Sequence, residues 1–199
     1  MFSKITTTQK TVFEIIFLLG LPIVIGSFLN LQTSNFVIFP FAILIMLRIF
    51  QLYRRGIITK EDDFQESKHI IKSFGVYSIF TVFALLVIFS IKDFLDLPYW
   101  LVNDEPWLFI LLHAFLQELI YRTYLINRLK IIFNNTFIIT FFGAFVFAGI
   151  HLLLPFSLTV IILTFISGFF WSFIYQKYPS LVFVTISHFL LNWVLISWF

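Results

Sequence analysis

The sequence of 199 residues contains no cysteine. This absence excludes disulfide bonds, thiol nucleophiles, thiolate zinc sites and iron–sulfur clusters. Charged residues are also scarce, because they make up 12% of the chain whereas a soluble domain has about a quarter. So low a charge content, together with 60% hydrophobic residues, excludes a soluble globular enzyme, a disordered regulator and a collagen-like fibre.

Large apolar side chains fill the chain instead. Phenylalanine accounts for 30 of the 199 residues, and the mean hydropathy is +1.00. A soluble core could not bury so many large side chains, whereas lipid accepts them. A spanning helix needs about 20 mostly apolar residues to cross a hydrocarbon core of about 30 Å. We therefore predict one all-α membrane domain, residues 1–199, with seven spans at 12–31, 36–53, 70–91, 107–127, 136–154, 157–176 and 180–198.

Basic residues are distributed unevenly between alternate loops. Eleven of the 13 lysines and arginines fall in the N-terminal segment, in 48–72, in 128–135 or at Lys177. Cytoplasmic loops carry such an excess, so the N-terminus is expected inside, in the cytoplasmic membrane if the source is bacterial. The net charge of +3 then reflects topology, and no nucleic-acid partner is expected. Segment 54–69 is expected to be a solvated loop, and 92–105 an interfacial one.

Within residues 107–199, two charged residues lie inside an expected span. Glu118 is the only side-chain carboxylate of residues 107–199, and Arg122 follows it at i+4. An ionisable group at mid-bilayer costs at least about 2.5–3.5 kcal/mol, so two of them on one helix need a reason. The spacing places both on one face, where they can form a buried ion pair. A purely structural pair is one explanation, but an apolar replacement is often no worse, which favours a functional role.

Three histidines also fall within expected spans: His113, His151 and His188. Each alone is more often an interhelical hydrogen-bonding group than a catalyst. Asn192 follows His188 at i+4 and therefore projects from the same face. Together with Glu118, these residues supply a carboxylate, imidazoles and a carboxamide from different spans. Such a set suits hydrolysis, because a carboxylate and an imidazole can activate water while an imidazole and an amide stabilise an oxyanion.

Three motifs at these residues resemble those of the CPBP family, the CAAX proteases and bacteriocin-processing proteins. The family motifs are Glu-Glu-x-x-x-Arg, Phe-x-x-x-His and His-x-x-x-Asn or Asp, in that order. They are matched by Gln117–Arg122, Phe147–His151 and His188–Asn192. The resemblance covers residues 107–199, a CPBP-like catalytic core, whereas residues 1–106 match only as generic spans and a loop.

The resemblance implies a glutamic intramembrane endopeptidase, similar to the Ras-converting CAAX endopeptidase. In that family, the first glutamate and the histidine of the second motif activate water, so His151 becomes the water partner here. By the same correspondence, His188 and Asn192 become the oxyanion donors. Arg122 becomes the residue that pairs with and orients the carboxylate region.

Gln117 departs from the family pattern, which has its first glutamate at that place. An amide cannot take a proton from water, and adjacent helical positions point about 100° apart. Three interpretations stay open. Glu118 serves as the base after a rotation of the helix, or Gln117 only positions water while His151 acts as the base, or the site is inert and retained as a scaffold.

The depths of the candidate residues differ. At 1.5 Å per residue, Glu118 and His188 lie about 14 and 12 Å from the inner surface, but His151 lies about 22 Å from it. The set therefore converges only if the fifth helix begins below the surface or tilts strongly. We expect the cavity between these residues to open to the cytoplasmic side, because Glu118 and His188 lie nearer the inner face.

Other functions fit the same residues. No cofactor is expected, but zinc bound by Glu118, His151 and His188 is the rival within the enzyme class. A catalytically impaired family member, acting in bacteriocin self-immunity or as a scaffold, is favoured by Gln117. A transporter is a third option, because intramembrane ionisable residues also mark proton relays. The expected partners are the bilayer and a membrane-associated protein or peptide substrate, and the sequence leaves the oligomeric state open.

Overall fold

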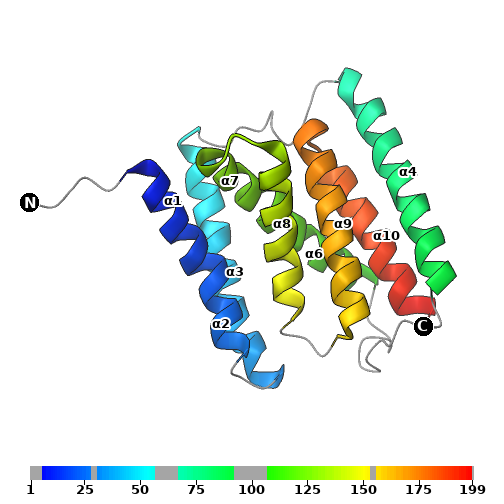
Figure 1. Cartoon of the computed structure of the whole chain (residues 1–199), viewed down its shortest axis with the longest axis horizontal. Helices are drawn as coiled ribbons and strands as arrows, with labels where there is room; N and C mark the ends of the chain where they lie inside the picture. Colours follow the sequence, from blue (N-terminus) through cyan, green and yellow to red (C-terminus); the bar gives the residue numbers. More distant parts are fainter. Residues whose placement is uncertain (1–5, 28–30, 57–66, 92–106, 153–155, 199) are drawn as a thin grey trace, which may run out of the picture.

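A computed structural model of the chain describes residues 6–27, 31–56, 67–91, 107–152 and 156–198 (Figure 1). Within these ranges the elements are helices, and no strand is present. Over the described residues, the helices join into seven helical segments, which we call runs, in agreement with the predicted number of spans. Most of segment 54–69, expected to be a loop, and all of segment 92–105, expected to be interfacial, lie outside the described residues.

The helical runs follow the expected spans closely. The first consists of α1 (Thr7–Ile15), the π-helix η1 (Ile16–Gly20) and α2 (Leu21–Ser27). The second and third are α3 (Leu31–Arg54) and α4 (Ser67–Ile91). The fourth consists of α6 (Trp107–Glu118), the π-helix η4 (Leu119–Ile126) and α7 (Asn127–Ile132). The last three are α8 (Thr136–His151), α9 (Leu158–Lys177) and α10 (Leu181–Trp198).

The first run begins five residues before the expected span because its N-terminus is capped. The hydroxyl of Thr6 accepts a hydrogen bond from the Gln9 backbone N–H, and the Gln9 side chain accepts one from the Thr6 N–H. This capping box satisfies two of the backbone donors that a helix start leaves open. The second run is a continuous helix that includes Pro40.

Successive runs alternate in direction, so the bundle has two distinct ends (Figure 1). We call one of them the basic end; there α1, α4, α8 and α10 begin, and α3, α7 and α9 end. It holds every described lysine and arginine except Arg122: Lys10, Arg48, Arg54, Arg55, Lys68, Lys72, Arg128, Lys130 and Lys177. The grouping matches the uneven loop charges from which an inside N-terminus is predicted.

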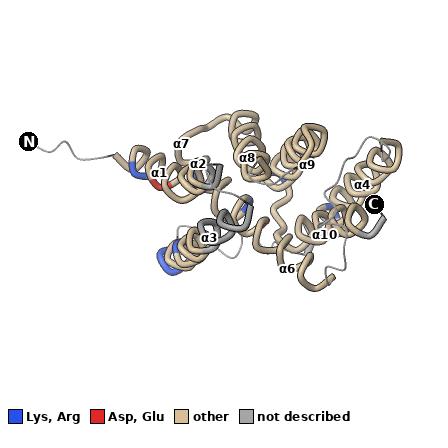
Figure 2. Tube along the Cα trace, turned by 90° about the horizontal axis from the view of Figure 1, so that it is seen from below, with Lys and Arg blue, Asp and Glu red and all other residues tan. Residues whose placement is uncertain are grey.

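Viewed along the helices, the bundle is an elongated assembly (Figure 2). Helices α1, α2 and α3 lie together on one side, α8 packs against α9, and α10 packs between α6 and α4. By length and composition, three described helices are able to cross a membrane: Ile70–Ile91, Trp107–Ile132 and Leu158–Lys177. The helices Thr136–His151 and Leu181–Ile196 are apolar but shorter.

The fourth run passes through the centre of the bundle and changes its helical form there. Glu118 is the last residue of α6, and the next eight residues form the π-helix η4. Six residues of η4 are buried, from Tyr121 to Ile126. Because π-helical turns are rare and are found mostly at functional sites, the change in form draws attention to the residues beside it.

Candidate active site

Glu118 lies at the centre of a buried polar cluster. Its Oε2 accepts a hydrogen bond of 2.7 Å from Nε of Arg122, and its Oε1 lies 2.7 Å from Nδ1 of His188. The ion pair predicted from the i, i+4 spacing is therefore present, and it is joined by an imidazole from α10. Glu118 and Arg122 are both 0% exposed, so their charges depend on each other and on His188 for stabilisation.

Arg122 connects this cluster to α9 and α8. Its Nη1 donates a hydrogen bond of 2.6 Å to the hydroxyl of Ser172. Its guanidinium carbon lies 5.3 Å from the centroid of the Phe147 ring, within the range of a cation–π contact. Its Nη2 is buried and has no hydrogen-bond acceptor among the described residues. Arg122 is thus held by Glu118 and Ser172.

A cavity of about 120 Å³ lies beside the cluster. It is lined by side chains from α4, α8, α9 and α10, and these include His151, His188 and Asn192. His151 belongs to the second sequence motif, and His188 and Asn192 belong to the third. All three residues line the same cavity. Among the lining residues, Trp171 and Phe147 supply the aromatic surface around the imidazoles.

The Phe147 ring lies near both His151 and His188, the two residues for which the sequence predicts different depths in the membrane. Its ring centroid lies 5.1 Å from that of His151 and 5.7 Å from that of His188. The large ring therefore bridges residues whose positions along α8 and α10 differ.

Each imidazole has one ring nitrogen fixed. Nδ1 of His151 lies 2.9 Å from the backbone carbonyl of Phe147, and since a carbonyl only accepts, Nδ1 carries the hydrogen. In His188, Nδ1 faces the carboxylate of Glu118 and likewise donates. Neither Nε2 has a hydrogen-bond partner within the described part of the chain. Both Nε2 atoms therefore remain for chemistry in the cavity.

Trp171 holds His188 from the other side. The two ring centroids are 4.6 Å apart, and the indole Nε1 donates a hydrogen bond of 2.9 Å to the Ser187 hydroxyl. The hydroxyls of Ser187 and Thr81 are 2.7 Å apart, which ties α10 to α4. His188 is thus fixed by a carboxylate at one edge and by an indole on its face.

Two glycines allow α8 and α9 to approach this closely. A Cβ on Gly168 would lie 2.7 Å from Cδ1 of Phe147, so the ring occupies the space that a side chain would fill. A Cβ on Gly143 would lie 2.8 Å from Cδ1 of Ile126 and 3.2 Å from the Ser172 hydroxyl. Both glycines are therefore required by close packing at the cluster.

Four other residues that the sequence analysis singled out do not line the cavity. Gln117, Glu118 and Arg122 are not among its described lining residues. Oε1 of Gln117 is buried and has no donor among the described residues. His113 is exposed on α6, and its ring contacts Phe109 at a centroid distance of 6.2 Å.

The cavity lies farther from the basic end than expected. Its lining comes from the second half of α4, the end of α8, the earlier part of α9 and α10 from His188 onward. Because successive helices alternate in direction, these parts belong to the half of the bundle away from the basic end (Figure 1). The expectation of a cytoplasmic opening placed the cavity nearer the basic end than it lies, and the side of the membrane to which it opens stays a prediction. It was based on Glu118 and His188 and gave too little weight to His151 and Asn192.

A zinc site at Glu118, His151 and His188 does not have the required geometry. Among the described residues, no group of three His, Asp or Glu side chains is arranged to hold a metal ion. In addition, both oxygens of Glu118 already bind Arg122 and His188. The side chains present do not fit a three-ligand zinc site.

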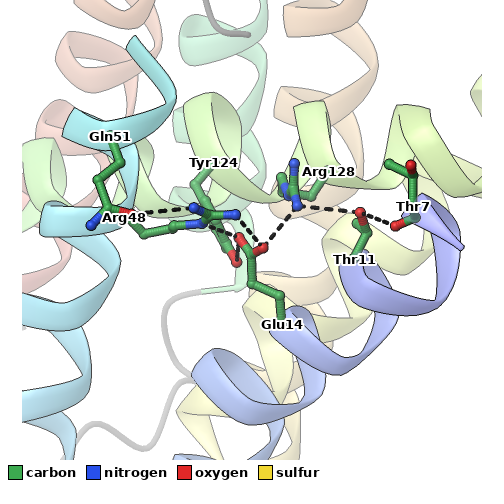
Figure 3. A network of polar contacts seen from close by, with 7 residues as sticks. All are labelled: Thr7, Thr11, Glu14, Arg48, Gln51, Tyr124 and Arg128. Carbon is green, nitrogen blue, oxygen red and sulfur yellow. Dashed lines mark hydrogen bonds and ion pairs between the residues drawn. The ribbon is translucent and has the colours of Figure 1, made fainter. Parts of the chain in front are cut away.

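The structure adds a second polar cluster that the sequence reasoning did not identify (Figure 3). The carboxylate of Glu14 on α1 accepts hydrogen bonds from Nε and Nη2 of Arg48 on α3, at 2.9 and 2.8 Å. It also accepts them from the Tyr124 hydroxyl at 2.9 Å and from Nη2 of Arg128 at 2.8 Å. A carboxylate inside the first expected span was the available signal. Ser172 and Trp171 gave none.

The helical runs and the buried polar centre define an all-α integral membrane protein. A family model described as "Type II CAAX prenyl endopeptidase Rce1-like" matches residues 81–194, which is more than half of the chain. The chain therefore belongs to this Rce1-like family, as its motifs indicate. The match begins within α4, before the region in which the motifs were recognised. Comparisons with curated proteins and with solved structures found no match.

Proposed function

We propose that the chain is an intramembrane endopeptidase that hydrolyses a peptide bond of a membrane-associated protein or peptide. Family membership supports this reaction class. The observation that carries the proposal is the convergence of His151, His188 and Asn192 on one cavity. The proposal includes the predicted membrane orientation, with the N-terminus inside, and the cytoplasmic membrane as the location in a bacterial source.

His151 is the proposed general base. Because its Nδ1–H is bound to the Phe147 carbonyl, Nε2 carries the lone pair and can accept a proton from water. Glu118 is poorly placed for this task, since both of its oxygens are occupied and it does not line the cavity. These contacts favour His151 over Glu118 as the base, as in the second interpretation, although Gln117, which would position the water there, is not among the described lining residues.

His188 and Asn192 are the proposed oxyanion donors. His188 donates through Nδ1 to Glu118, and its Nε2 donates into the cavity when that nitrogen carries a proton. Arg122 shares the Glu118 carboxylate with His188 and adds a positive charge to the cluster. That charge stabilises an oxyanion in a water-poor site.

The proposed reaction balances without a cofactor. His151 takes a proton from water, and the hydroxide forms a bond to the carbonyl carbon. The resulting oxyanion accepts hydrogen bonds from His188 and Asn192. His151 then donates its proton to the amide nitrogen, the C–N bond breaks, and the products are a carboxylic acid and an amine.

The direct test is cleavage of a mixed peptide library by the purified protein in lipid nanodiscs. The wild type should cleave slowly, and His151→Asn should lower the rate by about 10²–10⁴-fold, the usual contribution of a general base. Asn192→Ala should lower kcat by about 10²–10³-fold. The matched control is His113→Asn, because this histidine lies on an exposed face and should leave the rate unchanged. Equal loss in both histidine variants would contradict the assignment of the base.

A second candidate function is a non-catalytic role in bacteriocin self-immunity or scaffolding. It is favoured by the contacts of Glu118, because both of its oxygens bind Arg122 and His188 and no carboxylate is left to act on water. Gln117→Glu decides between the two. Silence in the wild type with cleavage by the variant would favour the non-catalytic role, whereas cleavage by both would favour the protease.

The metal alternative has its own test. We expect activity to survive prolonged dialysis against EDTA, because Glu118 is already engaged by Arg122 and His188. Loss of activity that returns with added zinc would move the mechanism to a metalloprotease.

A further inference from the structure

A second cavity lies at the basic end of the bundle, far along the helices from the candidate active site. It has a volume of about 520 Å³ and forms where α7 ends, α8 begins and α9 ends. Its lining includes Lys130 from α7 and Lys177 from the last turn of α9. Two segments that are far apart in the sequence thus place cations on one cavity.

The charge of this cavity is positive and uncompensated. Its lining contains no carboxylate within the described part of the chain. Both lysines are exposed, and neither forms an ion pair with a described residue. The ammonium of Lys177 instead lies 5.6 Å from the centroid of the Tyr178 ring. The two lysines therefore remain available to an anion.

The cavity also has an apolar wall and polar groups between the two lysines. Ile139 is buried, and Phe173 is 48% exposed, so its ring offers a surface for a hydrocarbon chain. Asn134 and Thr136 lie at the start of α8, where the chain leaves the apolar helix. Cations beside an apolar surface at the end of a membrane helix match the headgroup region of a bilayer.

We propose that this cavity binds the phosphate headgroup of an anionic phospholipid. Lys130 and Lys177 contact the phosphate, and Phe173 contacts the first part of an acyl chain. Basic pockets between transmembrane helices are a known way to hold such headgroups. A free phosphate is also anionic but lacks the acyl chain, so it cannot use the apolar wall.

The test counts bound lipids on the purified full-length protein by native mass spectrometry and compares phosphatidylglycerol with phosphatidylcholine. The wild type should bind phosphatidylglycerol preferentially. One lysine near a membrane surface contributes about a fivefold factor in binding, so Lys130→Gln/Lys177→Gln should weaken the binding of phosphatidylglycerol about 25-fold. The matched control is Arg54→Gln/Arg55→Gln, which removes the same charge from exposed positions at the same end.

The outcomes separate the possible sources of the anion. The control pair should retain the preference for phosphatidylglycerol, and inorganic phosphate should not compete with the lipid. Equal weakening in both pairs would mean that the whole basic end attracts anions, and the proposed site would be wrong. Competition by inorganic phosphate at the lipid's own affinity would contradict the assignment to a lipid. Because the assay requires no peptide cleavage, its failure is distinct from failure of the proposed protease function.

Discussion

Replacing Glu14 by glutamine should destabilise the bundle strongly. The amide has the same shape but no charge, so Arg48 and Arg128 lose their common carboxylate. In the wild type this carboxylate accepts hydrogen bonds from both arginines and from the Tyr124 hydroxyl (Figure 3). The substitution therefore leaves two neighbouring cations with no anion between them.

The magnitude follows from the burial of the group. Removing one partner of a fully buried ion pair costs about 3–5 kcal/mol. The Glu14 side chain is 15% exposed and that of Arg48 is 26% exposed, so solvent screens part of this cost. We therefore expect a loss of about 2–4 kcal/mol, and about 2–4 °C in Tm for each kcal/mol in a chain of this size.

Thermal unfolding in detergent checks the expectation, with Lys10→Gln as the matched control. Lys10 lies on the same helix, is exposed, and makes no ion pair with a described residue, so its loss should change the Tm little. Glu14→Gln/Arg48→Gln should be less destabilised than the sum of the two single variants, because the double variant removes one of the orphaned charges. A Tm for Glu14→Gln equal to that of Lys10→Gln would refute the reasoning.

Two further predictions concern the packing and hydrogen bonding of the candidate active site. Gly168→Ala should lower the free energy of unfolding by about 1–3 kcal/mol and should also lower the cleavage rate, because its Cβ would displace the Phe147 ring that contacts both imidazoles. Gly75→Ala, with no neighbour within 4 Å of its Cβ, should instead stabilise α4 by about 0.5–1 kcal/mol in the same unfolding assay. Ser172→Ala should cost about 1–3 kcal/mol, because Arg122 then keeps only Glu118; an unchanged Tm would contradict this.

The sequence predicts well what depends on local patterns. Runs of apolar residues identify the seven helices, and the i, i+4 spacing identifies the pair of Glu118 and Arg122. Both features are encoded within a few turns of one helix. The capping box at Thr6 was also visible as a Thr-x-x-Gln pattern, although hydropathy alone placed the first helix too late.

Contacts between distant helices are harder to predict from one sequence. The partner of Arg128 lies 114 residues away, at Glu14, and no spacing rule connects them. Ser172 and Trp171 lie in an apolar helix with no periodic signal, yet they hold Arg122 and His188. The position of the cavity was also missed, because the expectation relied on Glu118 and His188, whereas the polar lining comes from His151, His188 and Asn192.

Helix α8 is short for a membrane helix, and this has a consequence for the bilayer around it. Its 16 residues correspond to about 24 Å, against a hydrocarbon core of about 30 Å. Such hydrophobic mismatch is relieved by local thinning of the lipid. Because His151 is the last residue of α8, thinning would bring the headgroups and their hydration water toward this imidazole. The thickness of the surrounding membrane would then control how readily water reaches the site.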